Sequence, residues 1–365
     1  MLLDPADWSL AFRSDEVLAA LPADLQERVT LETHAAVMEV ATGVHLRVRD
    51  AVNELAGLRR RLSEALAEQG LRAAVAGTHP YAMADDTVVS SHPRYRQIGE
   101  TMRVLARREP TLATHVHVGV ATPGAAVRLL NRFRSHLPLL LALSANSPFW
   151  QGNASGFAST RTTLWDAFPR SGVPRHFAGY WDWIESVLPL LRSGAIADPS
   201  YLWWDVRLQP KLGTVEVRIM DGQTTVGDVG ALAALVQSLA SHELNRPDAP
   251  AEESVEVLEE NRFLAARDGM QALLIDVDTG ARVPAGAQLK RTLALCHRHA
   301  RQLHCEHELD ALRRLVTRGG AARQLAHGVG GDLRQVVAGL ARAYSPRRAM
   351  HALLDNRLRD KPAAV

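Results

Sequence analysis

The sequence predicts an α+β fold built on an antiparallel sheet. Strand-like and helix-like segments are mixed up to residue 220, whereas the pattern from residue 250 onwards is helical. Two strand-like segments, 203–209 and 214–220, are joined by a Pro-Lys-Leu-Gly sequence that is typical of a hairpin. Mixed elements followed by helices alone are typical of α+β proteins, in which helices cover one side of an antiparallel sheet.

The remaining elements follow from the spacing of apolar residues. Spacing near 3.6 residues predicts helices over 43–70, 93–108, 123–144, 177–193, 227–245 and from 250 onwards. Further strands are expected at Leu2-Leu3, at 71–76 and over 114–120, where apolar and polar residues alternate. Residues 147–176 show no period, and a connection of that length is usually functional. We expect a single domain over residues 1–365, with a helical carboxyl-terminal part at 250–360.

Composition and charge exclude several classes of protein. Hydrophobic residues make up 47% and charged residues 22% of the 365 residues, which is typical of globular proteins. Forty-two basic and 40 acidic residues give a net charge of +2, which argues against a nucleic-acid partner. Two cysteines supply no disulfide framework. We find no signal peptide and no apolar run of the roughly 18 residues that span a membrane, so a cytoplasmic protein without a membrane partner is expected.

The segment 211–221 is the most informative strand. Side chains alternate between the faces of a strand, so the apolar residues at 215, 217 and 219 point away from Glu216 and Arg218. This places a carboxylate and a guanidinium about 7 Å apart on one face. Such a pair can hold a metal ion and an anionic group, and an ordinary ion pair on a solvated face is the alternative.

Two further segments carry polar groups of the same kind. His115 and His117 lie on one face of the strand 114–120, where they can ligate a metal, contact phosphate, or simply face solvent. Glu39 interrupts an apolar stretch, and a buried glutamate must be paired or bind a cation. Several polar strands in one chain favour a functional sheet face.

Six segments, in order along the chain, resemble the family of type 2 glutamate–cysteine ligases, also called carboxylate–amine ligases. They are Gly77-Thr78-His79-Pro80, His115-Val116-His117-Val118-Gly119, Leu143-Ser144-Ala145-Asn146-Ser147-Pro148-Phe149-Trp150-Gln151-Gly152, Gly213-Thr214-Val215-Glu216-Val217-Arg218-Ile219-Met220-Asp221, Glu260-Asn261-Arg262-Phe263-Leu264-Ala265-Ala266-Arg267-Asp268-Gly269 and Gly319-Gly320-Ala321-Ala322-Arg323-Gln324. The resemblance covers residues 2 to 345.

This resemblance implies a glutamine-synthetase-like fold, in which a curved antiparallel sheet forms a funnel for ATP, Mg²⁺ and the acid. It also implies an ATP-dependent ligase that forms C–N bonds. The γ-carboxylate of glutamate takes the γ-phosphoryl group of ATP, and an amine, typically that of cysteine, displaces phosphate from the acyl phosphate. Such a step needs divalent cations and preorganised positive groups around the transferred phosphoryl group.

The resemblance also assigns roles to residues. It implies Glu39, Glu216 and His115 as Mg²⁺ ligands. It implies Arg218, His115 and His117 as catalytic groups around the phosphoryl group or the substrate carboxylate. The side chains implied as contacts of nucleotide and substrate are Thr78, His79, Asn146, Arg161 and Asn261.

The chain departs from the family at its start. Family members open with a strand that carries Gly-x-Glu-Glu-Glu ahead of a segment like Leu2-Leu3-Asp4-Pro5, and this acidic strand is absent here. Either the start codon is assigned too late, or the chain is a true truncation with weak or no activity. A missing strand would leave an exposed sheet edge, and we therefore expect a homodimer.

Other functions remain open from the residues alone. A non-catalytic nucleotide or small-molecule binder and a metal-dependent hydrolase would use the same polar face. A zinc site at Cys296, His299, His304 and His307 is a further alternative, but structural zinc sites have turns between their ligand pairs. The Trp residues and the carboxyl-terminal glycines form neither a base-stacking groove nor a phosphate loop.

Overall fold

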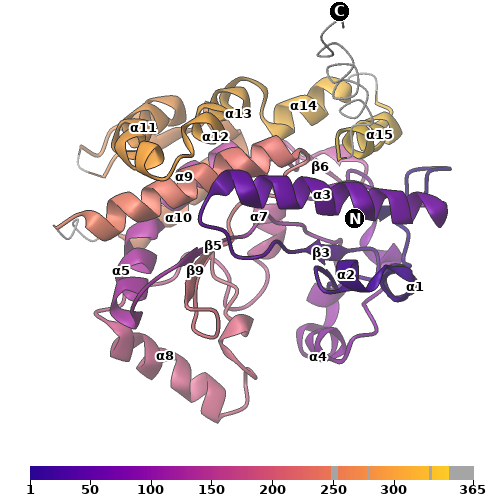
Figure 1. Ribbon diagram of the computed structural model, residues 1–365, viewed down its shortest axis with the longest axis horizontal. Coiled ribbons are helices and arrows are strands. Elements are labelled where there is room, and N and C mark those ends of the chain that lie inside the picture. Colours follow the sequence, from indigo (N-terminus) through magenta and orange to yellow (C-terminus); the bar gives the residue numbers. More distant parts are fainter. Residues whose placement is uncertain (248–253, 278, 329–330, 345–365) are drawn as a thin grey trace, which may run out of the picture.

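The computed structural model describes residues 1–247, 254–277, 279–328 and 331–344 (Figure 1). Its strands are β1 Leu2–Leu3, β2 Val29–Leu31, β3 Met38–Val40, β4 Arg72–Ala73, β5 Val116–Gly119, β6 Phe149–Trp150, β7 Asn153–Ala154, β8 Val206–Gln209, β9 Thr214–Val217, β10 Leu273–Ile275 and β11 Arg282–Pro284. Within these residues β5, β9 and β8 form an antiparallel three-stranded sheet in that order. The other strands pair antiparallel in twos, as β1–β4, β2–β3, β6–β7 and β10–β11.

Helices lie on both sides of these strands (Figure 1). They are α1 Ser14–Ala20, α2 Ala23–Gln26, α3 Val48–Glu68, α4 Pro93–Met102, α5 Pro123–Phe133, α6 Leu137–Ser144, α7 Thr160–Trp165, α8 Tyr180–Arg192, α9 Val226–Asn245, α10 Val255–Asp268, α11 Ala285–Gln302, α12 Glu306–Asp310, α13 Leu312–Arg318, α14 Gly320–His327 and α15 Leu333–Tyr344. Figure 1 shows α11 to α14 gathered above α9, with β5 and β9 beneath α9 and α8 below them. The prediction of an α+β fold is confirmed.

The core lies between the central sheet and helices α5, α6 and α9. Every residue of α6 is buried, and α9 is buried on most of its surface. The apolar face of the sheet, which includes Val215 and Val217, belongs to the same core. The polar face of the sheet is therefore the one that remains for chemistry.

Most of the predicted helices form, with differences that have local causes. Helix α3 begins at Val48 rather than 43, because the loop before it is held by Glu54, which accepts hydrogen bonds from the backbone of Gly43 and from His45. The predicted helix over 123–144 is divided into α5 and α6 by a 3-10 turn, and Pro138 lies in the first turn of α6, where it can donate no backbone hydrogen bond.

The expectation that the chain is helical from residue 250 onwards was wrong in one place. Strands β10 and β11 form an antiparallel hairpin between α10 and α11. Its short apolar run, Leu273–Ile275, is too brief to distinguish a strand from a buried helical segment by period alone. Residues 345–360 of the predicted helical part lie outside the described residues.

Candidate functional site

The polar face of the central sheet carries a row of ionisable side chains across its three strands. In the register of the sheet, Glu216 of β9 lies opposite His117 of β5 on one side and Arg207 of β8 on the other. Directly opposed residues of an antiparallel pair lie on the same face. An imidazole, a carboxylate and a guanidinium therefore lie side by side. The alternation of side chains in the sequence predicted a polar face for His117 and for Glu216, but Arg207 was not predicted.

Glu216 is the centre of this group. Its Oε2 accepts hydrogen bonds from Arg207 Nε at 2.7 Å and from Gln209 Nε2 at 2.7 Å. Its Oε1 accepts one from Arg218 Nη1 at 2.5 Å. The side chain is only 2% exposed, so a buried carboxylate is held between two guanidinium groups.

His115, Arg218 and Glu39 complete the group. His115 Nδ1 lies 3.5 Å from Glu216 Oε1, 3.5 Å from Arg218 Nη1 and 4.0 Å from Glu39 Oε1. His117 Nε2 lies 3.7 Å from Glu216 Oε1. The expected convergence of histidine, glutamate and arginine from separate strands is thus confirmed, although the role of each remains a prediction.

The environment sets the charge of each group. Burial alone would raise the pKa of Glu216, but the charges of Arg218 and Arg207 outweigh it and hold that pKa well below its usual range. Burial, followed by Arg218, holds the pKa of His115 well below its usual value. Burial also lowers the pKa of His117. At neutral pH the face therefore carries an ionised carboxylate, two guanidinium groups and neutral imidazoles.

Glu39 differs from what its apolar neighbours suggested. It belongs to β3, and its side chain is 49% exposed rather than buried. Desolvation by the surrounding protein, and next the charge of Glu32, nevertheless raise the pKa of Glu39.

Buried hydrogen bonds hold the backbone of Arg218 in place. Arg161 donates to the carbonyl oxygens of Ile219 and Arg218, at 3.0 and 3.2 Å, and lies 3.8 Å from Asp221. The backbone N–H of Arg218 donates to the carbonyl of Asp205 at 2.7 Å. Arg161 is thus in direct contact with the backbone of a site residue.

The other residues implied as nucleotide or substrate contacts are buried and engaged with the protein. Thr78 donates to the carbonyl of Phe149, and His79 donates to that of Trp8. Asn146 donates to Gly222 and Thr224, and its oxygen accepts from Gln324. Asn261 exchanges two hydrogen bonds with Ile275. None of these four contacts the group around Glu216 in the described residues, and their predicted roles remain untested.

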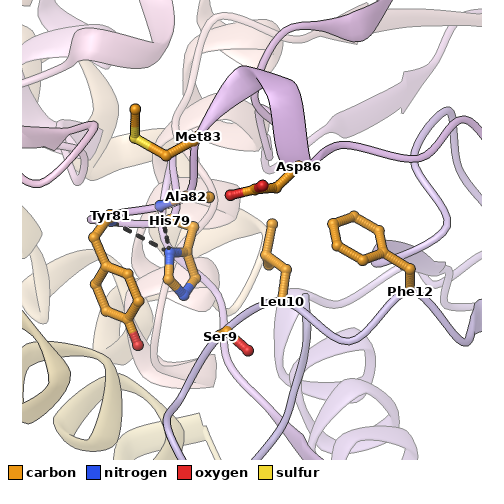
Figure 2. Close-up of a pocket in the computed structure, with 8 residues that line it drawn as sticks. All are labelled: Ser9, Leu10, Phe12, His79, Tyr81, Ala82, Met83 and Asp86. Carbon is orange, nitrogen blue, oxygen red and sulfur yellow. Dashed lines mark hydrogen bonds between the residues drawn. The ribbon is translucent and has the colours of Figure 1, made fainter.

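A cavity of about 360 Å³ opens beside His79 (Figure 2). It is lined by Ser9, Leu10, Phe12, His79, Tyr81, Ala82, Met83 and Asp86. His79 Nδ1 accepts hydrogen bonds from the backbone N–H groups of Tyr81 and Ala82. Both ring nitrogens of His79 are therefore occupied by the protein, and the lining contains none of the sheet residues named above.

The donor set fits the expected Mg²⁺ only in part. Glu39 offers an exposed carboxylate, but both oxygens of Glu216 already accept hydrogen bonds from cationic or amide donors, and Mg²⁺ prefers oxygen to imidazole ligands. In residues 1–247, 254–277, 279–328 and 331–344, no group of three or more His, Cys, Asp or Glu side chains is arranged to hold a metal ion. That finding also covers the cysteines and histidines of the zinc alternative.

Sequence reasoning missed Arg207 and Gln209. Both lie on β8 at alternate positions, with Val206 and Leu208 buried on the opposite face. The same period of two that identified Glu216 could have found them. The predicted hairpin, with its loop at 210–213, would also have placed Arg207 opposite Glu216, as the register of β8 and β9 does.

The fold resembles that of a solved structure, and the sequence matches a family model. The structure resembles the 2.0 Å crystal structure of a glutamate–cysteine ligase from Francisella tularensis in complex with AMP, with a TM-score of 0.66 and 13% identity, covering 98% of this chain and 90% of that one. The family model of glutamate–cysteine ligase family 2 matches residues 3–339. The chain belongs to that family.

Relatives agree with this assignment. The "Putative glutamate--cysteine ligase 2-1" of Rubrobacter xylanophilus is 38% identical over 351 residues, which are 95% of this chain and 93% of the relative. A similarly named protein of Sorangium cellulosum is 35% identical over 336 residues, 91% of this chain and 85% of the relative. The described residues contain no helix long and apolar enough to cross a membrane.

Proposed function

We propose that this protein is an ATP-dependent carboxylate–amine ligase that joins the γ-carboxylate of glutamate to an amine such as cysteine through an acyl phosphate. The observation that carries the proposal is the convergence of Arg207 and Arg218 on one sheet face in a chain of this family. Their two guanidinium groups lie beside the carboxylates of Glu216 and Glu39, and guanidinium groups suit the binding of carboxylate or phosphate. An ATP-consuming reaction and two free cysteines fit a cytoplasmic enzyme.

Arg218 is the group that we assign to the transferred phosphoryl group or the substrate carboxylate. Its Nε is a buried donor without a partner among the described residues. Leaving such a group unpaired costs about 1–3 kcal/mol, which an anionic ligand would offset. Arg161, whose side chain donates to the carbonyl of Arg218, likewise has an Nε without a partner among these residues. Both observations support a ligand that supplies acceptor oxygens here.

The neutral imidazoles of His115 and His117 add hydrogen-bond donors without adding charge. Preorganised donors aimed at developing negative charge are the largest contribution to catalysis in many enzymes. When bound, Mg²⁺ would neutralise charge on the ATP phosphates, and Glu39 is the carboxylate best exposed to contact it. No step is assigned to the metal, because both carboxylate oxygens of Glu216 already accept hydrogen bonds from arginine side chains.

The test is release of phosphate from ATP in the presence of Mg²⁺, glutamate and a panel of amines. The proposal expects release that requires both glutamate and an amine. Nucleotide binding without such release would favour a non-catalytic binder, and phosphate release that depends on a substrate but needs no ATP would favour a hydrolase.

Variants then test the assigned residues. Arg218→Ala should lower kcat by about 10²- to 10³-fold, as for loss of one transition-state donor, and Glu216→Gln should also lower it. Arg60→Ala, on the exposed face of α3, serves as the matched control. Equal rates for wild type and Glu216→Gln would refute the role of Glu216.

A further inference from the structure

The guanidinium of Arg207 makes more hydrogen bonds than a surface ion pair requires. Its Nη1 donates to the carbonyl oxygens of Ser200 and Leu202, at 2.5 and 3.0 Å. Its Nε and Nη2 face the two oxygens of Glu216, at 2.7 and 3.4 Å. Because the guanidinium is planar, these four contacts determine the orientation of the whole group.

The fixed orientation of Arg207 also fixes Glu216 and, through Glu216, Arg218. Arg207 and Gln209 hold Oε2 of Glu216, so Oε1 is the oxygen that faces Arg218 Nη1 at 2.5 Å. A carboxylate without Arg207 could rotate, and Arg218 would then lose its fixed acceptor. Rotamer freedom in a catalytic contact is costly, since a misplacement of about 1 Å can lower a rate by about 10²-fold.

A purely structural explanation has to be separated from this one. In that explanation, Arg207 only anchors the segment 200–203 to the sheet. Arg170 anchors the same segment, because it donates to the carbonyl of Tyr201 at 3.1 Å and lies over the ring of Trp203 at 5.1 Å. No contact of Arg170 in the described residues reaches Glu216. It is therefore a matched control.

We infer that Arg207 is a positioning residue, which holds the Glu216 carboxylate so that Glu216 in turn aims the Arg218 guanidinium at the anionic substrate. The inference rests on the proposed function for the role of Arg218. It adds a residue that the sequence motifs did not single out. Arg207 itself does not contact the substrate in this account.

The experiment compares Arg207→Lys, Arg207→Gln and Arg170→Gln with wild type. We measure kcat, the KM for ATP and for glutamate, the calorimetric affinity for ATP with Mg²⁺, and the thermal midpoint. Arg207→Gln should lower kcat by about 10²-fold with a smaller change in the KM for glutamate. Arg207→Lys keeps the charge but not the planar fork, and should lower kcat by about tenfold. Arg170→Gln should leave kcat within about twofold even where its midpoint falls.

Added guanidinium ion gives a second readout, because it can fill the space left in Arg207→Gln and restore part of kcat, with no effect on wild type. Equal losses of kcat in Arg207→Gln and Arg170→Gln, without rescue, would overturn the inference and leave only anchoring. Should Arg207→Gln fail to fold, Arg207→Lys decides: kcat equal to wild type overturns the inference.

The two proposals can fail separately. An active wild type with an unaffected Arg207→Gln variant leaves the ligase function standing and removes the positioning role. If wild type is inactive with every amine, the ligase proposal fails, and ATP affinity decides the inference instead. That affinity should fall about tenfold in Arg207→Gln and not in Arg170→Gln. A wild type that binds no ATP overturns both.

Discussion

Replacing His79 with asparagine should flatten the acid dependence of the protein's stability. His79 is 1% exposed, its Nδ1 accepts two backbone hydrogen bonds, and its Nε2 therefore carries the proton donated to the carbonyl of Trp8 (Figure 2). Burial lowers its pKa from 6.5 to about 4. In the variant, the amide oxygen of asparagine provides an acceptor near the position that Nδ1 of His79 occupies in wild type. The asparagine side chain does not titrate.

The sign and size follow from that pKa. The folded pKa lies below the unfolded one, so the unfolded chain binds more protons between pH 6.5 and about 4. The unfolding free energy is therefore highest above pH 6.5 and falls as the pH drops through this window. A difference of about 2.5 pKa units at 1.36 kcal/mol each corresponds to roughly 3 kcal/mol. His34, with a pKa also lowered to about 4 by burial, contributes a second share that the variant retains.

Urea denaturation of wild type and His79→Asn at pH 7.5, 5.5 and 4.5 measures the unfolding free energy of each protein. On acidification, wild type should lose on the order of 3 kcal/mol more than the variant. The variant starts less stable at pH 7.5, because it lacks the hydrogen bond to Trp8, and loses less stability on acidification. His307→Asn, at a side chain 85% exposed, is the control. If His79→Asn and wild type lose the same unfolding free energy between pH 7.5 and 4.5, the reasoning about His79 is wrong.

Two further substitutions probe the support of the site. Arg262→Met leaves the buried carboxylate of Asp205 without the guanidinium that contacts it at 2.5 Å, and should cost about 3–5 kcal/mol by urea titration; a loss below about 1 kcal/mol would contradict a buried pair. Gly77→Ala would place a methyl carbon 2.7 Å from Cγ of Asp221, and should lower the unfolding free energy by about 1–3 kcal/mol. Gly57→Ala, within α3 and with open space at its Cβ position, should instead stabilise by about 0.4–1 kcal/mol in the same urea titrations, and equal effects of the two alanines would rule out the steric explanation.

The strands of the site show how far local patterns reach. The period of two in 114–120 and 214–220 predicted which residues turn toward the core, and Val215 and Val217 are indeed buried while His117 and Glu216 share the other face. The same reasoning did not find the hairpin of β10 and β11, because three apolar residues do not distinguish a strand from a helix. Glu39 was predicted to be buried from its apolar neighbours, yet neighbours in sequence do not determine which face of β3 meets the core.

The sequence by itself determined the α+β class, the family and the polar composition of the central strands, because these depend on residue order and on a local repeat. Only the tertiary structure decided that Asp205 and Arg161 hold the backbone of Arg218, and that Glu39 meets solvent. Those facts depend on strand register and on contacts between segments far apart in the chain. Pairing energies of that kind are summed over the whole core, and no short window of sequence contains them.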